Sequence, residues 1–401
     1  MGYSASHLAR GLKVVTAGLA AVSLAGCLGS GLDLGTFVEP PAATPQAGQA
    51  STIGNGAVRV AVILPLTGSG QGAVAAASLR NAADMAMAEF QNPDITLIVK
   101  DDQGTPEGAR EAAQQAVSEG AELIIGPLFA ASTQAAGQVA RQAGKPVIAF
   151  STDASVASRG IFLLSFLAQS EVDRIVDYAV DKGRRSFAAL IPETTYGNVV
   201  EAQFREAAAR RGARVVALER YPVGQPQAAV SRMAPLIGGA SAQADALFIP
   251  DSADGLPAVG QALAQIGFNP QRVKPIGTGI WNDARAFGTA ALQGGWFAAP
   301  DSSGFNAFAE RYRARFGSDP TRVATLSYDA VSLAAALART QGSQRFSETV
   351  LTSSSGFAGA DGVFRFRADG TNERALAVIE VRNGAAATVS PAPKALSQSA
   401  T

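Results

Sequence analysis

Two residue types that perform much of protein catalysis are nearly absent from this chain. It has 401 residues but one histidine, His7, and one cysteine, Cys27. Both lie within the first 27 residues, so the chain beyond them offers neither an imidazole nor a thiol. This excludes Ser-His-Asp or Cys-His catalysis, histidine-ligated zinc and disulfide bonds from the rest of the chain. No paired-carboxylate motif is present either. We therefore expect no enzyme, no metal site and no cofactor.

The charges and loops of the chain also limit its partners. The 33 Lys and Arg residues equal the 33 Asp and Glu residues, and no basic run is long enough to follow a phosphate backbone. We therefore expect no nucleic-acid partner. The loop Gly68-Ser69-Gly70-Gln71-Gly72-Ala73 nearly matches a dinucleotide-binding fingerprint. Pro65 precedes this loop, and the second half of the chain repeats the plan of the first, so we expect no nucleotide there.

The N-terminal segment has the pattern of an export signal. Arg10 and Lys13 precede residues 14–26, which are apolar or small and carry no charge. A membrane span needs about 20 apolar residues, so this shorter run indicates the core of a signal peptide. The run ends in Leu24-Ala25-Gly26-Cys27, which resembles the lipobox of bacterial lipoproteins, where the cysteine is lipidated. The alternative is an ordinary secretory signal that happens to contain a cysteine.

The lipobox resemblance implies a signal peptide over residues 1–26 and a periplasmic protein held in the membrane by a lipid on Cys27. The next residue is Leu28. An aspartate at that position tends to hold Gram-negative lipoproteins at the inner membrane, so we expect the outer membrane. Residues 27–57 are rich in Gly, Pro, Ala, Thr and Gln, a composition typical of a flexible tether. Residues 384–401 are expected to form a flexible tail.

The body of the chain alternates predicted strands and helices. After Arg59, residues 60–64 form a continuous apolar run, which is typical of a strand buried on both faces of a parallel sheet. The alternation occurs twice, and right-handed crossovers would build each half into a parallel sheet. We therefore predict an α/β fold with two doubly wound lobes and a ligand at the carboxyl ends of the strands. The predicted strands are 59–64, 95–100, 122–125, 146–149, 186–191, 214–218, 246–249 and 273–276, and the predicted helices are 73–90, 106–118, 132–143, 198–211, 227–237 and 256–266.

Several short motifs occur in a characteristic order between residues 58 and 383. They are Val60-Ala61-Val62-Ile63-Leu64-Pro65-Leu66-Thr67-Gly68, Asp101-Asp102, Ile124-Ile125-Gly126-Pro127-Leu128, Lys145-Pro146-Val147-Ile148, Tyr196-Gly197, Phe308 to Tyr312, Phe316-Gly317, Tyr328-Asp329-Ala330-Val331, Gly362-Val363-Phe364-Arg365-Phe366 and Asp369-Gly370. No single motif is decisive. In this order and spacing they resemble the leucine-binding-protein family of type I periplasmic binding proteins.

The resemblance implies two lobes between which the chain crosses three times, and which close on a ligand by a hinge. The crossings would fall near residues 165–170, 297–300 and 357–360. Lobe one would then comprise residues 58–166 and 299–357, and lobe two residues 167–298 and 358–383.

In lobe one, the residues that the resemblance places at the ligand differ from the family pattern. Amino-acid binders of the family have a serine where this chain has Ala130, and Ser132 and Thr133 follow it closely. These two hydroxyls could bind the ligand or cap the next helix. After the fourth strand the candidates are Ser151, Thr152 and Asp153, with Asp153 at the family's threonine position. An acid there would repel a ligand carboxylate, unless it turns away to cap a loop.

In lobe two, the resemblance implies an aromatic residue and an acid at the ligand. Tyr196 matches the family's tyrosine, although Tyr196-Gly197 could simply begin a helix. The acid that would hold a ligand ammonium falls near Gly255, so Asp251 and Asp254 are the candidates. Trp281 follows a strand and could form a wall of the cleft or pack at its rim.

Two functions follow from these expectations. The first is the non-enzymatic solute-binding component of an ABC importer for amino acids or small amides, with a permease as its partner. The second is an outer-membrane lipoprotein that activates a peptidoglycan synthase, as penicillin-binding-protein activators of the same fold do. Fold membership favours the first, while Leu28, the tether and the altered amino-acid site favour the second.

Overall fold

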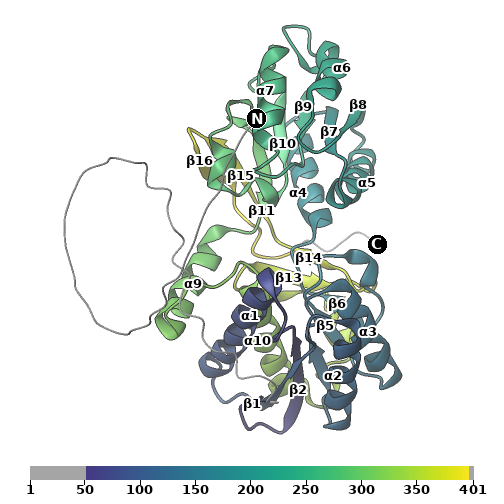
Figure 1. The fold of residues 1–401 in the computed structure, drawn as a ribbon, viewed down its shortest axis with the longest axis vertical. Coiled ribbons are helices and arrows are strands. Elements are labelled where there is room, and N and C mark those ends of the chain that lie inside the picture. Colours follow the sequence, from purple (N-terminus) through teal and green to yellow (C-terminus); the bar gives the residue numbers. More distant parts are fainter. Residues whose placement is uncertain (1–50, 397–401) are drawn as a thin grey trace, which may run out of the picture. The chain divides into compact units, whose positions relative to one another are not determined.

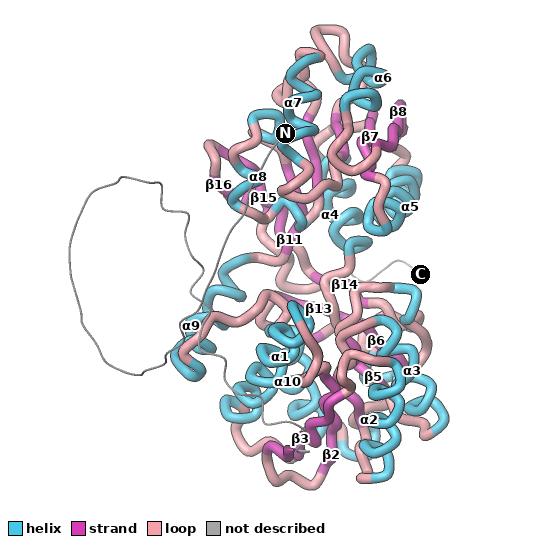
Figure 2. Tube along the Cα trace, viewed as in Figure 1, coloured by secondary structure: helices cyan, strands magenta, loops and turns pink. Residues whose placement is uncertain are grey.

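The computed structural model describes residues 51–396, and Cys27 with the predicted signal peptide lies outside this range. The described chain forms two α/β lobes, each built on its own sheet (Figures 1 and 2). Lobe one has a six-stranded sheet in the order β1-β3-β2-β4-β5-β6, in which only β1 is antiparallel to its neighbour. Its strands are β1 (Ser51–Ile53), β2 (Val58–Leu64), β3 (Ile95–Asp101), β4 (Leu123–Ile125), β5 (Val147–Ala149) and β6 (Ile161–Leu163).

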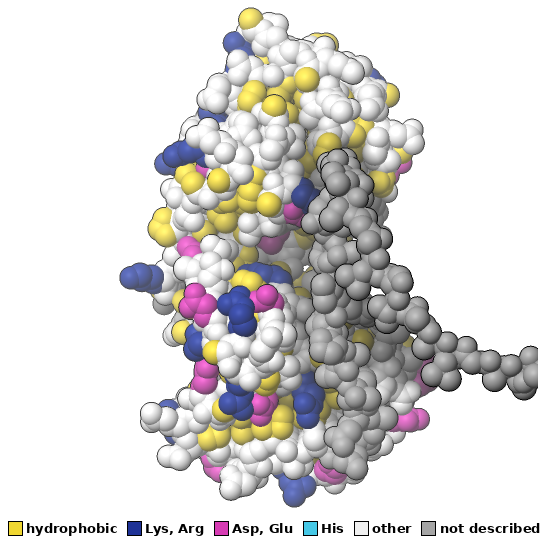
Figure 3. All heavy atoms as spheres, turned by 60° about the vertical axis from the view of Figure 1, so that its left-hand side comes forward, with side chains coloured by type: hydrophobic (Ala, Val, Ile, Leu, Met, Phe, Trp, Pro, Cys, Tyr) yellow, Lys and Arg dark blue, Asp and Glu magenta, His cyan; other side chains and the backbone are white. Residues whose placement is uncertain are grey.

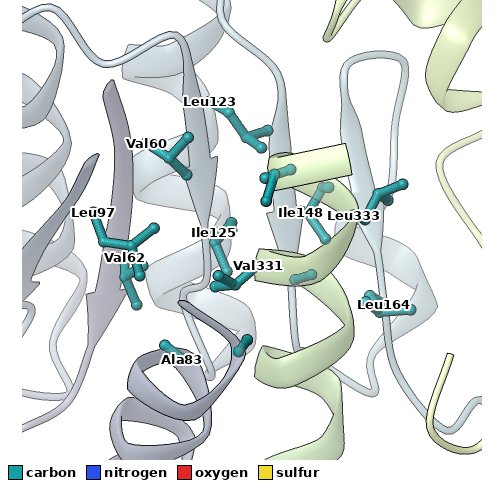
Figure 4. Packing of buried hydrophobic residues seen from close by; sticks show 14 of the residues in the cluster. Val60, Val62, Ala83, Leu97, Leu123, Ile125, Ile148, Leu164, Val331 and Leu333 are labelled. Atoms are coloured by element: carbon teal, nitrogen blue, oxygen red, sulfur yellow. The ribbon is translucent and has the colours of Figure 1, made fainter. Parts of the chain in front are cut away.

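Two pairs of helices cover the two faces of this sheet. Along β2, Val60 and Val62 pack toward one pair, whereas Ala61 and Ile63 pack toward the other. This alternation buries the strand on both faces, as its continuous apolar sequence predicts. Figure 4 shows the first face, where strand side chains meet Val331 and its neighbours. The helices are α1 (Gly70–Glu89) with α10 (Ala324–Thr340), and α2 (Pro106–Ser118) with α3 (Ala130–Gln142).

Lobe two has a seven-stranded sheet in the order β16-β15-β11-β10-β9-β7-β8. The first five strands in sequence are parallel, and β15 and β16 extend the sheet as antiparallel strands. Helices α4 and α5 cover one face, and α6 and α7 cover the other. The elements are α4 (Ala168–Asp181), β7 (Ser186–Pro192), α5 (Thr195–Arg210), β8 (Arg214–Tyr221), α6 (Gln227–Ile237), β9 (Ala246–Phe248), α7 (Leu256–Gln265), β10 (Lys274–Gly277), β11 (Trp296–Ala299), β15 (Ala377–Arg382) and β16 (Ala385–Ser390).

Short elements complete the described chain. A small antiparallel sheet, β12-β13-β14, follows α10 and precedes β15. Helix α9 packs on α1 through Phe308 and Tyr312. The remaining bounds are η1 (Ala154–Val156), η2 (Gly279–Trp281), α8 (Ala284–Phe287), η3 (Ala290–Leu292), α9 (Ser302–Phe316), η4 (Gly342–Gln344), α11 (Glu348–Leu351), β12 (Phe357–Gly359), β13 (Gly362–Phe366) and β14 (Asn372–Arg374).

The α/β fold class with two doubly wound lobes is confirmed, but three predicted boundaries differ from the structure. Phe364 and Phe366 of β13 belong to the core of lobe one, so the third passage to lobe two follows β14 and not residues 357–360. Residues 385–390 form β16 on the edge of β15, although we expected a flexible tail from residue 384. Residues 51–53 of the expected tether form β1 on the edge of β3. Both added strands give partners to edge backbone groups that would otherwise face solvent.

Candidate functional site

The loop after β4 leads directly into helix α3 in lobe one. Phe129 is the N-cap residue of α3, and no side chain caps this helix. Ser132 and Thr133 therefore lie inside the first turn, and the alternative that they cap α3 is wrong. Both are buried, and neither hydroxyl oxygen has a hydrogen-bond partner among the described residues. As placed here, neither side chain is available to a ligand in solvent.

Phe129 is an aromatic side chain that sequence reasoning missed. It is 40% exposed, one of four large apolar side chains with substantial exposure in the described chain. A Cβ atom on Gly72 would lie 2.8 Å from Phe129 Cζ, and one on Gly104 would lie 3.5 Å from Cε2. The ring therefore stands over the first turn of α1 and the loop that follows β3, at the carboxyl edge of the sheet. The signal in the sequence was that Phe129 directly precedes Ala130, which the resemblance placed at the ligand.

The loop after β5 holds Ser151, Thr152 and Asp153. Ser151 is buried and its Oγ accepts a hydrogen bond from the Asp153 N–H at 3.1 Å, while Thr152 is exposed. Asp153 Oδ1 accepts from the Ser155 N–H at 2.9 Å and so caps η1. This is the loop-capping alternative for Asp153, so its carboxylate is already used within its own turn.

A surface cavity of about 370 Å³ joins this loop to the first turn of α3. Ala130 and Asp153, two of the positions that the resemblance placed at the ligand, both line it. Arg141 also lines it and donates to Ser158 Oγ at 3.1 Å. The structure therefore brings the two predicted loops of lobe one together, although Ser132 and Thr133 are not part of the lining.

Tyr196 lies in the first turn of α5, just after β7 ends in lobe two. Its hydroxyl and Thr278 Oγ1 are 2.6 Å apart and share a hydrogen bond. Thr278 follows β10, and β9 lies between β10 and β7 in the sheet, so Tyr196 reaches across the end of β9. Burial raises the pKa of Tyr196, so the phenol stays neutral.

The two acids predicted near Gly255 already have partners. Asp251 is buried, and its oxygens accept from the Tyr221 hydroxyl and from the Ser252 N–H, both at 2.7 Å. Asp254 is exposed and forms an ion pair with Arg285 at 2.6 Å. Neither carboxylate is therefore free to hold a ligand ammonium in this structure.

Trp281 is a core residue of lobe two. It has no exposed surface, and its indole N–H donates to the Ile249 carbonyl at 2.8 Å. The ring packs against Phe297 at a centroid distance of 6.2 Å. The structure thus places Trp281 beneath the surface of the lobe, and the prediction of a cleft wall is wrong for this conformation.

Glu171, which sequence reasoning also missed, lies at the same edge of lobe two. It is in the first turn of α4, and its Oε2 accepts from the Gly279 N–H at 2.9 Å. Burial raises the pKa of this carboxyl to about 8, against the opposing effect of Arg322. The signal in the sequence was an acid directly after the predicted crossing at residues 165–170.

A buried group of charged residues lies where the chain passes between the lobes. Arg322 pairs with the buried Asp361 through two hydrogen bonds of 2.8 Å. Arg374 is 5% exposed, and none of its guanidinium nitrogens has a hydrogen-bond partner among the described residues. It lies over Phe166 at 5.1 Å from the ring centroid. Burial raises the pKa of Asp329 to about 7, and Arg374 opposes this shift.

Glu171 and Arg374 both border a cavity of about 10 Å³ beside Phe166. This is roughly the space that a single water molecule occupies. No cluster of His, Cys, Asp and Glu that could hold a metal ion occurs within residues 51–396. No helix in that range is long and apolar enough to cross a membrane.

Known structures share this fold over most of the chain. A putative branched-chain amino acid ABC transporter protein from Rhodospirillum rubrum aligns with a TM-score of 0.73 at 20% identity, covering 83% of this chain and 99% of that one. A solute-binding protein from R. palustris in complex with benzoate aligns with a TM-score of 0.56 at 20% identity, covering 86% and 99%. A branched-chain amino acid binding protein from Streptococcus pneumoniae in complex with isoleucine aligns with a TM-score of 0.55 at 21% identity, covering 83% and 99%.

The sequence itself matches a family model. Comparison with curated proteins gives no match. The model described as periplasmic binding protein covers residues 57–386, which is nearly the whole described chain. With its two-lobe α/β fold, this chain belongs to the periplasmic binding protein family, in the leucine-binding-protein branch that the order of its motifs indicates.

Proposed function

We propose that this protein is the solute-binding component of an ABC importer, and that it binds an amino acid or a small amide without changing it chemically. The observation that carries this proposal is that candidate binding residues gather at the strand ends of each lobe. Lobe one offers the cavity between α3 and the Asp153 loop. Lobe two offers Tyr196 and Glu171. Ligands in open α/β sheets bind at such edges, and the relatives crystallised with isoleucine and benzoate support a small organic ligand.

The proposal includes a location and a partner. A lipid on Cys27 would hold the protein in the periplasm, at the outer membrane on the evidence of Leu28, and a permease would receive the ligand. The chain needs no cofactor for this role. The chain after residue 27 contains no histidine or cysteine, which is consistent with binding alone.

The direct test is a melting-temperature screen of the chain from residue 51, followed by calorimetry on any compound that stabilises it. The panel would contain the common amino acids, their amides, benzoate and peptidoglycan fragments. A ligand present at 100 times its Kd stabilises the folded state by about 2.7 kcal/mol, which a melting curve detects easily. Stabilisation by an amino acid or amide supports import. No shift with any solute would contradict it.

A second candidate is activation of a peptidoglycan synthase, and the altered amino-acid site favours it. Ala130 offers no hydroxyl, Asp153 stands where relatives offer one, and Asp251 and Asp254 are already paired. These features are expected if the fold no longer serves amino-acid uptake.

A binding experiment at Asp153 distinguishes the two candidate functions. The variant Asp153→Thr restores the family's hydroxyl at this position. Weak leucine binding by the parent that improves in this variant would support loss of amino-acid uptake. Micromolar leucine or valine binding by the parent would contradict it. Stimulation of a purified peptidoglycan synthase by the parent protein would support the second candidate directly.

A further inference from the structure

One carboxylate oxygen at the carboxyl edge of lobe two has no partner. Glu171 Oε2 accepts from Gly279, but Oε1 accepts no hydrogen bond from any described residue. Oε1 is not fully buried, because it keeps some contact with solvent. A side chain that is only 9% exposed thus presents one accepting oxygen outward.

The surroundings of this oxygen are specific to it. A Cβ atom on Gly279 would lie 2.6 Å from Oε1, so only glycine allows this close approach. Glu171 bonds to Gly279 and the Tyr196 hydroxyl bonds to the preceding residue, Thr278, so both side chains meet the same turn after β10. The carboxyl group and the phenol are therefore both fixed at the turn from β10 into η2.

Neither of the two arginines near Glu171 forms an ion pair with it among the described residues. Arg322 acts on Glu171 but is paired bidentately with Asp361. Arg374 borders the adjoining cavity of about 10 Å³, and the charges of Asp329 and Asp361 act on it without a hydrogen bond. An added positive group at Oε1 would therefore meet an acid without a salt bridge of its own.

We propose that Glu171 is a specificity-determining residue that binds a primary amine or ammonium group of the ligand through Oε1. This inference rests on the proposed function of ligand binding and names the acid that serves it. It replaces Asp251 and Asp254 in that role. Because burial raises the pKa of Glu171 to about 8, the free carboxyl holds a proton at neutral pH, and an ammonium would bind as that proton is released. The charged hydrogen bond that results is about twice as strong as a neutral one, so the site would favour amine-bearing ligands.

Four probes with one isobutyl body test the proposal by calorimetry on residues 51–401. Leucinamide and leucine carry the amine, whereas 4-methylpentanamide and 4-methylpentanoate lack it. The amine-bearing probe of each pair should bind the parent more tightly. Glu171→Gln should weaken the amine-bearing probes by about tenfold and leave the others within about twofold. Glu206→Gln is the matched control, because Glu206 is an exposed acid of the same lobe, and it should change nothing.

Several results would overturn the assignment. One is equal binding of each pair to the parent. Another is an equal loss of all four probes in Glu171→Gln, or amine binding that survives in both Glu171→Gln and the shortened variant Glu171→Asp. If only 4-methylpentanamide binds, the assignment of Glu171 as the amine-binding residue fails, while the proposed binding of small amides is supported. If no probe and no solute of the wider panel binds, the proposed function fails as well.

Discussion

At the scale of the single residue, the buried acid Glu171 makes the stability of the protein depend on pH. Its pKa is raised from 4.5 to about 8 in the folded protein. Between these values the folded state keeps a proton that the unfolded state releases, so stability falls as pH rises from about 4.5 to about 8. Asp329, raised to about 7, acts in the same direction.

We therefore predict that Glu171→Gln flattens the dependence of stability on pH. The parent should lose free energy of unfolding on the order of a few kcal/mol between pH 5 and pH 8, and the variant should lose less. Urea unfolding at both pH values measures this difference. Glu206→Gln should follow the parent, and a variant of Glu171 that keeps the full decline would contradict the burial argument.

A second prediction at this scale compares Tyr196 with Ser132. Tyr196 lies at the carboxyl edge beside Glu171, whereas the Ser132 hydroxyl is buried without a partner. For any ligand that the screen identifies, Tyr196→Ala should weaken binding by about 2–3 kcal/mol through lost apolar contact. Ser132→Ala should change binding little. Equal titration curves for Tyr196→Ala and the parent would remove Tyr196 from the site.

The residues of the site were only partly predictable. Tyr196 and Asp153 could be placed at strand ends because the family's motif order fixes those loops. Glu171 could not, because its role depends on Gly279, more than 100 residues away in sequence. The hydrogen bond from Tyr221 to Asp251 could not be predicted either, because a pair of side chains that are distant in sequence leaves no local pattern.

Elements with a strong local pattern were predicted almost to the residue. The apolar run of β2 and the helix α2 match their predicted ranges closely. Strands β1 and β6 were not expected, because β1 lies in the segment whose composition is typical of a tether, and β6 follows β5 without the helix that the alternating pattern requires. Strand β16 is partly exposed and rich in alanine, and it is a strand because β15 offers it a free edge.

The turn from β10 into η2 gives a prediction at the scale of the element. Gly277 ends β10, and a Cβ atom there would overlap the ring of Trp281. We expect Gly277→Ala to lower the free energy of unfolding by about 1–3 kcal/mol through overpacking. Gly288→Ala is the control, because nothing lies within 4 Å of its Cβ position. Denaturant midpoints measure both, and an unaffected Gly277→Ala would show that the ring can move.

At the scale of the whole molecule, basic and acidic residues balance each other. On the face shown in Figure 3, basic and acidic side chains are intermingled and do not form separate patches. This agrees with the equal numbers of basic and acidic residues. Attachment to a membrane would then depend on the lipid and not on surface charge.

We therefore predict that Cys27→Ala releases the protein from membrane fractions of cells that express the full chain. Fractionation with immunoblotting measures the release, and the parent protein should remain bound in high salt. A variant that stays with the membrane in high salt would show that another part of the chain holds it there.

The two tryptophans of the chain, Trp281 and Trp296, both belong to lobe two. Lobe one therefore contributes no indole to the intrinsic fluorescence of the protein. An emission change on unfolding reports lobe two, whereas circular dichroism reports the helices of both. Disagreement between the two signals would mean that the lobes melt separately, and a compound held by lobe one alone would leave the emission spectrum unchanged.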